Sequence, residues 1–112
     1  MAQTHSDINL IERRGATTIE VTGELDLSAA QKFDGAIRDL CEHPPREVTI
    51  DVRGLSFIDS IGLRALIEAQ MRLEAVGCAS CVIHRGGYVL DIIRMTGADK
   101  LLRLEERLEV RT

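Results

Sequence analysis

Runs of apolar residues that alternate with polar ones, or that are rich in β-branched residues, predict five strands. The first two flank Arg14-Gly15-Ala16, so they are expected to form a hairpin. The third follows Pro44-Pro45, and the last two lie in the final third of the chain. The five runs are residues 8–12, 18–21, 47–52, 80–84 and 101–104.

Apolar residues spaced three or four apart predict three helices between the later strands. In the first helix, Phe33 and Ile37 fall on one side. Ser28 and Gln31 at its start have the spacing of a capping box. The second helix follows a loop of residues 54–59. The helices begin at Ser28, at about Ser60 and at Tyr88, and they end before Pro44, at Gly77 and at Gly97.

The predicted order is β-β-α-β-α-β-α-β, in which strands alternate with helices long enough for right-handed crossovers. This order is typical of an α/β fold. We expect one domain with a mixed, mostly parallel sheet of about five strands and three to four helices, the fourth being a partial turn after Arg107. Residues 1–7 are polar and are expected to form a flexible tail, so the domain is expected to span residues 8–112.

The composition of the chain disfavours several classes of function. A formal net charge of -4 disfavours direct nucleic-acid binding, and an aromatic content of 3% leaves few rings on which bases stack. The chain has no apolar run near the roughly 18 residues that span a bilayer, and its polar N-terminus lacks the apolar stretch of a signal peptide. We therefore expect a cytoplasmic protein without a membrane partner. The odd number of cysteines, Cys41, Cys78 and Cys81, is a poor disulfide framework.

Two acidic loops lie where an α/β fold usually binds its partners, at the carboxyl ends of parallel strands. Glu24 and Asp26 follow the second strand, and Asp59 and Ser60 follow the third and open the second helix. Asp and Ser are also preferred at helix N-termini. Helix capping alone therefore explains Asp59 and Ser60 about as well as a partner-binding role does.

The residues after Ser60 favour a docking surface. Ile61 does not fit the buried side of the helix and is expected to face solvent. Gly62 costs up to about 1 kcal/mol relative to Ala in a helix, and its missing side chain would leave room for another molecule. The expected partner-binding residues are Glu24, Asp26, Asp59, Ser60, Ile61, Gly62, Leu63 and Arg64.

Three short motifs add a family resemblance that spans roughly residues 8–108. Phe57-Ile58-Asp59-Ser60-Ile61-Gly62-Leu63 resembles the D-S-x-G-L signature of the STAS domain, found in anti-sigma factor antagonists. Gly23-Glu24-Leu25-Asp26 resembles the family's G-E-[LI]-D segment, and Met95-Thr96-Gly97 is similar to its T-G-[LA] turn. Each motif alone is weak, but the three lie in the expected order.

The resemblance implies a binding module and not an enzyme. In this family the unphosphorylated antagonist binds an anti-sigma factor and thereby frees a sigma factor for transcription. The anti-sigma factor is commonly also a serine kinase of the histidine-kinase-like ATPase fold, which inactivates the antagonist by phosphorylating the hydroxyl of D-S-x-G-L. A phosphatase reverses the modification. The resemblance thus implies phosphorylation at Ser60 and no cofactor, since any ATP belongs to the partner.

Ile61 departs from the family pattern. Many relatives carry hydroxyls at both positions between Asp and Gly, and the accepting one differs between members. Here Ser60 is the one hydroxyl between Asp59 and Gly62. STAS domains also serve as unphosphorylated scaffolds in stress-signalling assemblies, or as small subunits of lipid-transport complexes. That alternative stays open.

Other chemistries have weaker support. A phospho-aspartate receiver needs a lysine after its last strand, and Lys32 and Lys100 are poorly placed for that role. A hydrolase needs a G-x-S-x-G elbow or a histidine paired with Ser60, and neither is evident. Cys78-x-x-Cys81-x-x-His84 would alternate between the two faces of a strand and lacks a fourth metal ligand. Buried packing is therefore expected for it, and no metal site.

Overall fold

A computed structural model describes residues 7–108. Within this range the strands form one sheet in the order β1-β2-β3-β4-β5. The first pair is antiparallel, and every later neighbour is parallel. The strands are β1 (Asp7–Arg13), β2 (Ala16–Leu25), β3 (Glu47–Ile58), β4 (Ala79–His84) and β5 (Leu104–Glu106). The expected mixed, mostly parallel α/β sheet is confirmed.

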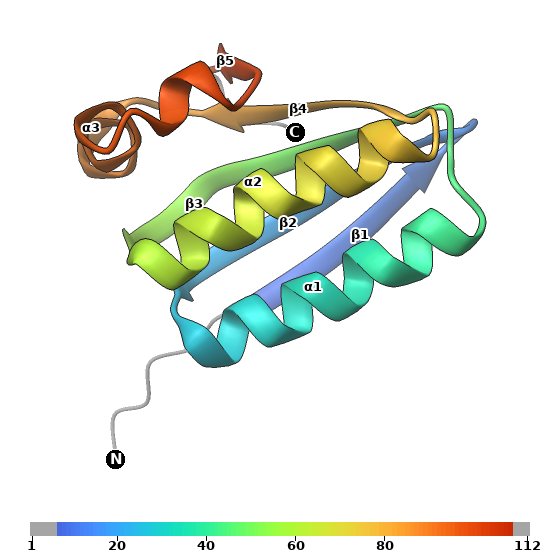
Figure 1. Ribbon diagram of the computed structural model, residues 1–112, viewed down its shortest axis with the longest axis horizontal. Coiled ribbons are helices and arrows are strands. Elements are labelled where there is room, and N and C mark those ends of the chain that lie inside the picture. The colour runs from blue at the N-terminus through green and yellow to red at the C-terminus, as the bar shows by residue number, and fades with distance from the viewer. Residues whose placement is uncertain (1–6, 109–112) are drawn as a thin grey trace.

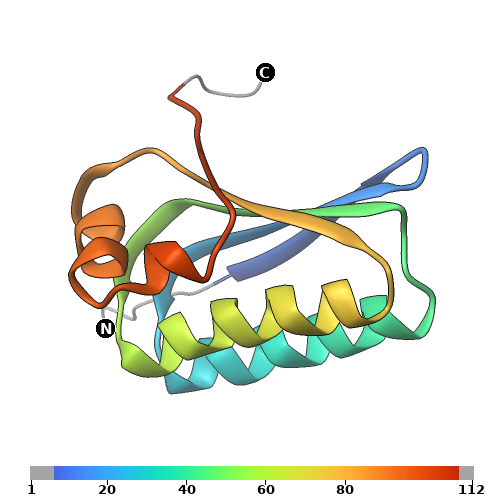
Figure 2. The same cartoon turned by 45° about the horizontal axis from the view of Figure 1, so that its top comes forward.

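The helices connect the parallel strands. They are α1 (Leu27–Glu42), α2 (Ser60–Ala75), α3 (Gly87–Met95) and the short 3-10 turn η1 (Ala98–Lys100). Helices α1 and α2 lie side by side along one face of the sheet, and α3 lies at one end of it (Figure 1). The turned view shows the same layering, with the sheet above the two long helices (Figure 2). Since each crossover leads to the next strand, the N-termini of α1 and α2 are neighbours at one edge of the sheet.

The core lies between the sheet and the two long helices. Phe33 and Ile37 of α1, Leu66 of α2, and Ile19 and Ile50 of the sheet are completely buried. The apolar side expected for the first helix is therefore confirmed. Burial of such side chains stabilises the fold by about 1.5–3 kcal/mol each, so this layer fixes where the helix N-termini stand.

Turn and helix-end signals are confirmed at two places. Arg14 and Gly15, with φ of 49° and 84°, connect β1 to β2 in the expected hairpin. Gly97, with φ of 82°, follows the end of α3 in the left-handed conformation that favours glycine.

The start of α1 differs from the expectation. Asp26 is the N-cap, and its Oδ1 accepts a hydrogen bond from the backbone N–H of Ala29 at 3.1 Å. Ser28 lies inside the first turn, so the expected capping box at Ser28 is wrong. The helix begins earlier because β2 runs up to Leu25, and the chain turns into α1 directly after it.

The expected loop of residues 54–59 is also wrong, because β3 continues to Ile58. Its second half pairs with the second half of β2, although the register shifts twice along the pair. These irregularities break the alternation of apolar and polar residues, which is why the sequence pattern stopped at residue 52.

The two ends of the domain are displaced from their expected places. The last strand is Leu104–Glu106, while Leu102 is buried in the core just after η1. The apolar side chain of Leu102 therefore indicates burial in the core and not a position within a strand. β1 begins at Asp7, the last residue of the expected tail, and residues 1–6 lie outside the described range. Most of the expected turn after Arg107 also lies outside it.

Gln70 connects α2 to β4 and to the segment before β5. It is buried, and its Nε2 donates to the carbonyl oxygen of Ser80 at 3.2 Å and to the hydroxyl of Ser80 at 3.1 Å. Its Oε1 accepts from the backbone N–H of Arg103 at 2.8 Å. One polar side chain thus satisfies groups on two segments that adjoin the apolar core.

We expect Gln70→Leu to lower the free energy of unfolding by about 2 kcal/mol, because the N–H of Arg103 and the groups of Ser80 lose their partner. Urea unfolding measures this value. Gln31→Leu on the exposed side of α1 is the matched control, with a change within about 0.5 kcal/mol. Equal free energies of unfolding for the two variants would show that the hydrogen bonds of Gln70 make no net contribution to stability.

Candidate functional site

The ends of β2 and β3 bring the two acidic segments together. Leu25 and Ile58 are paired at the end of the two strands, and each is followed by an aspartate that caps a helix. Asp59 Oδ1 accepts from the backbone N–H of Gly62 at 2.8 Å, as Asp26 does from Ala29. Both carboxylates are therefore held at neighbouring helix N-termini, where the helix dipole favours negative charge.

Ser60 is the first residue of α2, and it is exposed. Within the described part of the chain its hydroxyl has no hydrogen-bond partner, because the cap is provided by Asp59. The hydroxyl is therefore accessible to a reagent or an enzyme. Helix capping, considered above for both Asp59 and Ser60, is therefore the role of Asp59 alone. The Ser60 side chain takes no part in the cap.

Other expected partner-binding residues lie at the end of β2, directly after it, or at the start of α2. Ile61 is 44% exposed, as expected, and Arg64 is exposed one turn later. Glu24, Asp26 and Asp59 are half-buried. We define the Ser60 surface as Glu24, Asp26, Asp59, Ser60, Ile61 and Arg64.

Gly62 and Leu63 lie beneath this surface. Both are buried, so the expectation that they meet a partner directly is corrected. A Cβ on Gly62 would stand 2.2 Å from the carbonyl oxygen of Leu25. The glycine therefore permits the close approach of α2 to the end of β2, and it does not make room for another molecule.

A shallow groove runs between α1 and α2 beside the Ser60 surface. It has a volume of about 160 Å³ and is lined by Leu27, Ala30, Gln31, Asp34, Ile61, Arg64, Ala65 and Glu68. Leu27 is 55% exposed on the α1 side, opposite Ile61 on the α2 side. Sequence reasoning missed Leu27 because it placed the start of α1 one residue later. Two exposed apolar side chains beside an acidic edge suit a protein partner.

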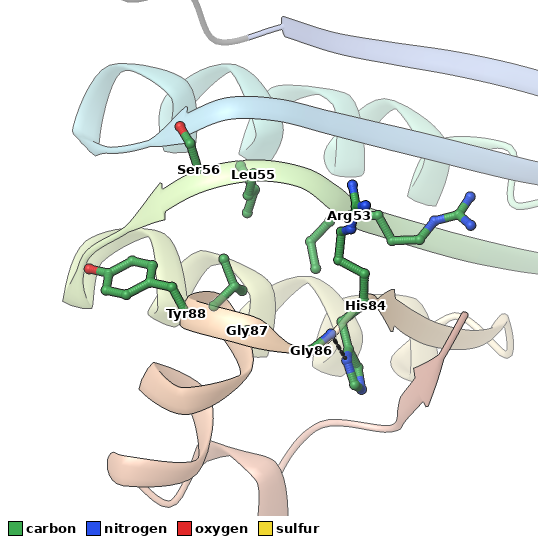
Figure 3. A pocket seen from close by; sticks show the side chains of 10 residues that line it. Arg53, Leu55, Ser56, His84, Gly86, Gly87 and Tyr88 are labelled. Carbon is green, nitrogen blue, oxygen red and sulfur yellow. Dashed lines mark hydrogen bonds between the residues drawn. The ribbon is translucent and has the colours of Figure 1, made fainter. Parts of the chain in front are cut away.

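A second hollow, of about 300 Å³, lies where β3 and β4 diverge (Figure 3). Its lining includes Ser56, His84 and Tyr88, and His84 Nδ1 accepts from the backbone N–H of Gly86 at 3.0 Å. Ser60 is not one of its lining residues. This hollow and the Ser60 surface are therefore separate features of the molecule.

The cysteines lie in and beside the packed interior. Cys78 is buried, and Cys41 and Cys81 are half-buried. Burial raises the pKa of the Cys78 thiol, and the nearby Cys41 and Glu47 raise it further. Burial also raises the pKa of Cys81, against a hydrogen bond with Thr49 that lowers it. Within residues 7–108, no group of three or more His, Cys, Asp or Glu side chains is arranged to hold a metal ion.

Because a raised pKa leaves less thiolate at a given pH, we expect Cys78 to react with iodoacetamide about tenfold or more slowly at pH 8 than in the urea-unfolded chain. Its rate should rise as the pH is increased. Peptide mass spectrometry measures the rate at each cysteine. A rate equal to that of the unfolded chain would contradict the raised pKa and the burial of Cys78.

None of the helices among the described residues has the length and apolar character needed to cross a membrane.

The comparison with protein families identifies the fold family. The family model described as the STAS domain matches residues 7–110. The chain belongs to the STAS domain family. The resemblance seen in the sequence motifs is thereby confirmed, and the α/β architecture described above is the STAS fold.

Individual relatives of this STAS domain carry more specific names. The anti-sigma-F factor antagonist RsfB of Mycobacterium tuberculosis (strain CDC 1551 / Oshkosh) is 26% identical over 98 residues, which cover 87% of this chain and 79% of the relative. A solved anti-sigma factor antagonist from Mycobacterium paratuberculosis has a TM-score of 0.82 and 26% identity, covering 92% of this chain and 87% of the other.

The STAS domain is also similar to the Bacillus cell fate determinant SpoIIAA in its phosphorylated form. The TM-score is 0.71 at 20% identity, covering 92% of this chain and 93% of that one. At this identity the likeness concerns the fold alone.

Proposed function

We propose that this STAS domain is an anti-sigma factor antagonist that binds an anti-sigma factor, frees a sigma factor, and is switched off by phosphorylation of Ser60. The observation that carries the proposal is the exposed hydroxyl at the first residue of α2, which has no hydrogen-bond partner among residues 7–108. The names of the relatives RsfB and the Mycobacterium paratuberculosis antagonist support it.

The position of Ser60 suits a switch that changes the surface and not the fold. A phosphoserine carries about -1.5 to -2 charges at neutral pH, and a helix N-terminus tolerates such an anion. Asp26 and Asp59 already cap the two helices, so the added charge would meet negative neighbours. A partner that docks here would be repelled while the domain remains folded.

The proposed partner is an anti-sigma factor that is also a serine kinase of the histidine-kinase-like ATPase fold, and a phosphatase restores the serine. The exposed Arg64 of the Ser60 surface suits an acidic group on that partner, which an added phosphate would repel. The partner supplies ATP and the catalytic groups, so the proposal assigns neither a cofactor nor a catalytic step to this chain. Because sigma factors act with RNA polymerase, the proposal includes a cytoplasmic location.

Labelling with γ-phosphate tests the proposal. The domain and its Ser60→Ala variant are each incubated with the kinase-type anti-sigma factors of the source organism and labelled ATP. We expect one of these kinases to label the wild type at Ser60 and to leave the variant unlabelled. Labelling at another residue, or equal labelling of both proteins, would contradict the assigned acceptor.

Ile61 favours a second function. It occupies the position where many relatives carry a further hydroxyl, and it exposes an apolar side chain beside Ser60. A phosphorylation-independent scaffold, or a small subunit of a stress-signalling or lipid-transport complex, would use the same surface for permanent binding. Stable binding of a partner by both the wild type and Ser60→Asp, without labelling, would favour this function.

A further inference from the structure

Arg64 lies one helical turn after Ser60 on α2. Residues four apart on a helix are neighbours on its surface, and long side chains lean towards the N-terminus. The exposed Arg64 side chain is therefore suited to reach back over the first turn of α2, where the Ser60 hydroxyl stands.

The guanidinium of Arg64 is not committed to another group. It has no ion pair within residues 7–108. Asp34, in the same groove, already pairs with Arg38 at 2.7 Å and with Arg72 at 2.9 Å. Glu68 lies four residues C-terminal to Arg64, which is the less favourable order for an ion pair on a helix.

We propose that Arg64 binds the phosphate of phosphorylated Ser60 within the same molecule. This inference rests on the proposed phosphorylation and names the group that receives the phosphate. The phosphate would be the N-terminal anion of an (i, i+4) pair, which is the favourable order, and it carries more charge than a carboxylate. A guanidinium also matches phosphate geometry, because two of its N–H groups can donate in parallel.

A pair between Arg64 and the phosphate would change the Ser60 surface in two ways. Arg64 is the one cation in that set of residues, so before modification it is free to meet an acidic group of the anti-sigma factor. After modification the phosphate occupies Arg64 and adds negative charge beside Asp59. The partner then loses a contact and meets repulsion in the same event.

The test measures the proton affinity of the phosphate. Full-length protein is made with phosphoserine inserted at position 60 during translation, and the phosphorus NMR shift is followed against pH. Arg64→Gln removes the cation. Arg64→Lys keeps the positive charge but lacks the two parallel N–H donors of the guanidinium. Arg13→Gln is the control: Arg13 is exposed and pairs with Ala16 at the start of β2, about 30 Å along that strand from its end at Leu25 and beyond the screening length of about 8 Å. The charged groups around Ser60 and Arg64 that stay unchanged in all four proteins are Glu24, Asp26, Asp34, Asp59 and Glu68.

We expect Arg64→Gln to raise the proton affinity of the phosphate dianion about twofold, because the dianion loses its neighbouring cation. Arg64→Lys should fall between it and the wild type, and Arg13→Gln should match the wild type. The Arg64 Nε–H signal should also shift when Ser60 carries the phosphate. Equal proton affinities in the wild type and Arg64→Gln, or an unshifted Arg64 signal, would overturn the proposal.

This test separates the pair from the function on which it rests. The phosphate is inserted without a kinase, so the titration reports on Arg64 whether or not a kinase acts on Ser60. Failure of the labelling experiment would therefore overturn the proposed regulation alone, and failure of the titration would overturn the Arg64 pair alone.

Discussion

Gly62→Ala is expected to lower the free energy of unfolding by about 3 kcal/mol, although alanine is the better helix former. The added Cβ would stand 2.2 Å from the carbonyl oxygen of Leu25 and 2.8 Å from its Cγ. Leu25 is completely buried, so neither its backbone nor its side chain can move away without disturbing the core. Helix α2 must therefore shift away from the end of β2.

Gly35→Ala is the matched control. Gly35 lies within α1, and a Cβ there would meet nothing within 4 Å. The same substitution should therefore stabilise the domain by about 0.5–1 kcal/mol. Urea unfolding of both variants gives the two values. Stabilisation by Gly62→Ala as well would show that α2 does not need its close approach to Leu25.

Phosphorylation of Ser60 is expected to weaken binding to the anti-sigma factor about a hundredfold. A doubly charged phosphate about 6 Å from one acidic group of the bound partner, at an intermediate dielectric, costs on the order of 3 kcal/mol, and this corresponds to that ratio. Titration calorimetry with the anti-sigma factor that co-purifies from the native cell measures it. The phosphorylated and unmodified domains should unfold within about 0.5 kcal/mol of each other, because the helix N-terminus accommodates the anion.

Ser60→Ala is the control for this effect. It removes an exposed hydroxyl that has no partner among the described residues, so it should bind like the unmodified domain even after incubation with kinase and ATP. Two results would contradict the switch: equal affinities of the phosphorylated and unmodified domains, or unfolding of the domain on phosphorylation.

The order of elements and the start of α2 could be predicted from the sequence, because each rests on local signals. Asp59 before an apolar helical pattern marks a cap, and Gly97 marks a helix end. The second half of β3 could not be predicted, because its bulged pairing with β2 depends on residues distant in sequence.

The same distinction applies to the candidate site. Ile61 is exposed as the sequence predicts, because it does not lie on the buried side of the helix, and Ser60 is exposed beside it. Gly62 was misinterpreted, because only the folded chain brings Leu25 against it. Leu27 was missed for a related reason: its exposure follows from Asp26, and not Ser28, being the N-cap of α1.

The contact between Gly62 and Leu25 fixes the spacing of the two helix starts through backbone atoms. Leu27 and Ile61 project from this fixed frame into solvent, so either can be exchanged without altering the frame. If the Ser60 surface and its groove bind the partner as proposed, exchange of these two side chains would change which partner the domain fits. Such a change of partner could evolve at the surface while the interior is left intact.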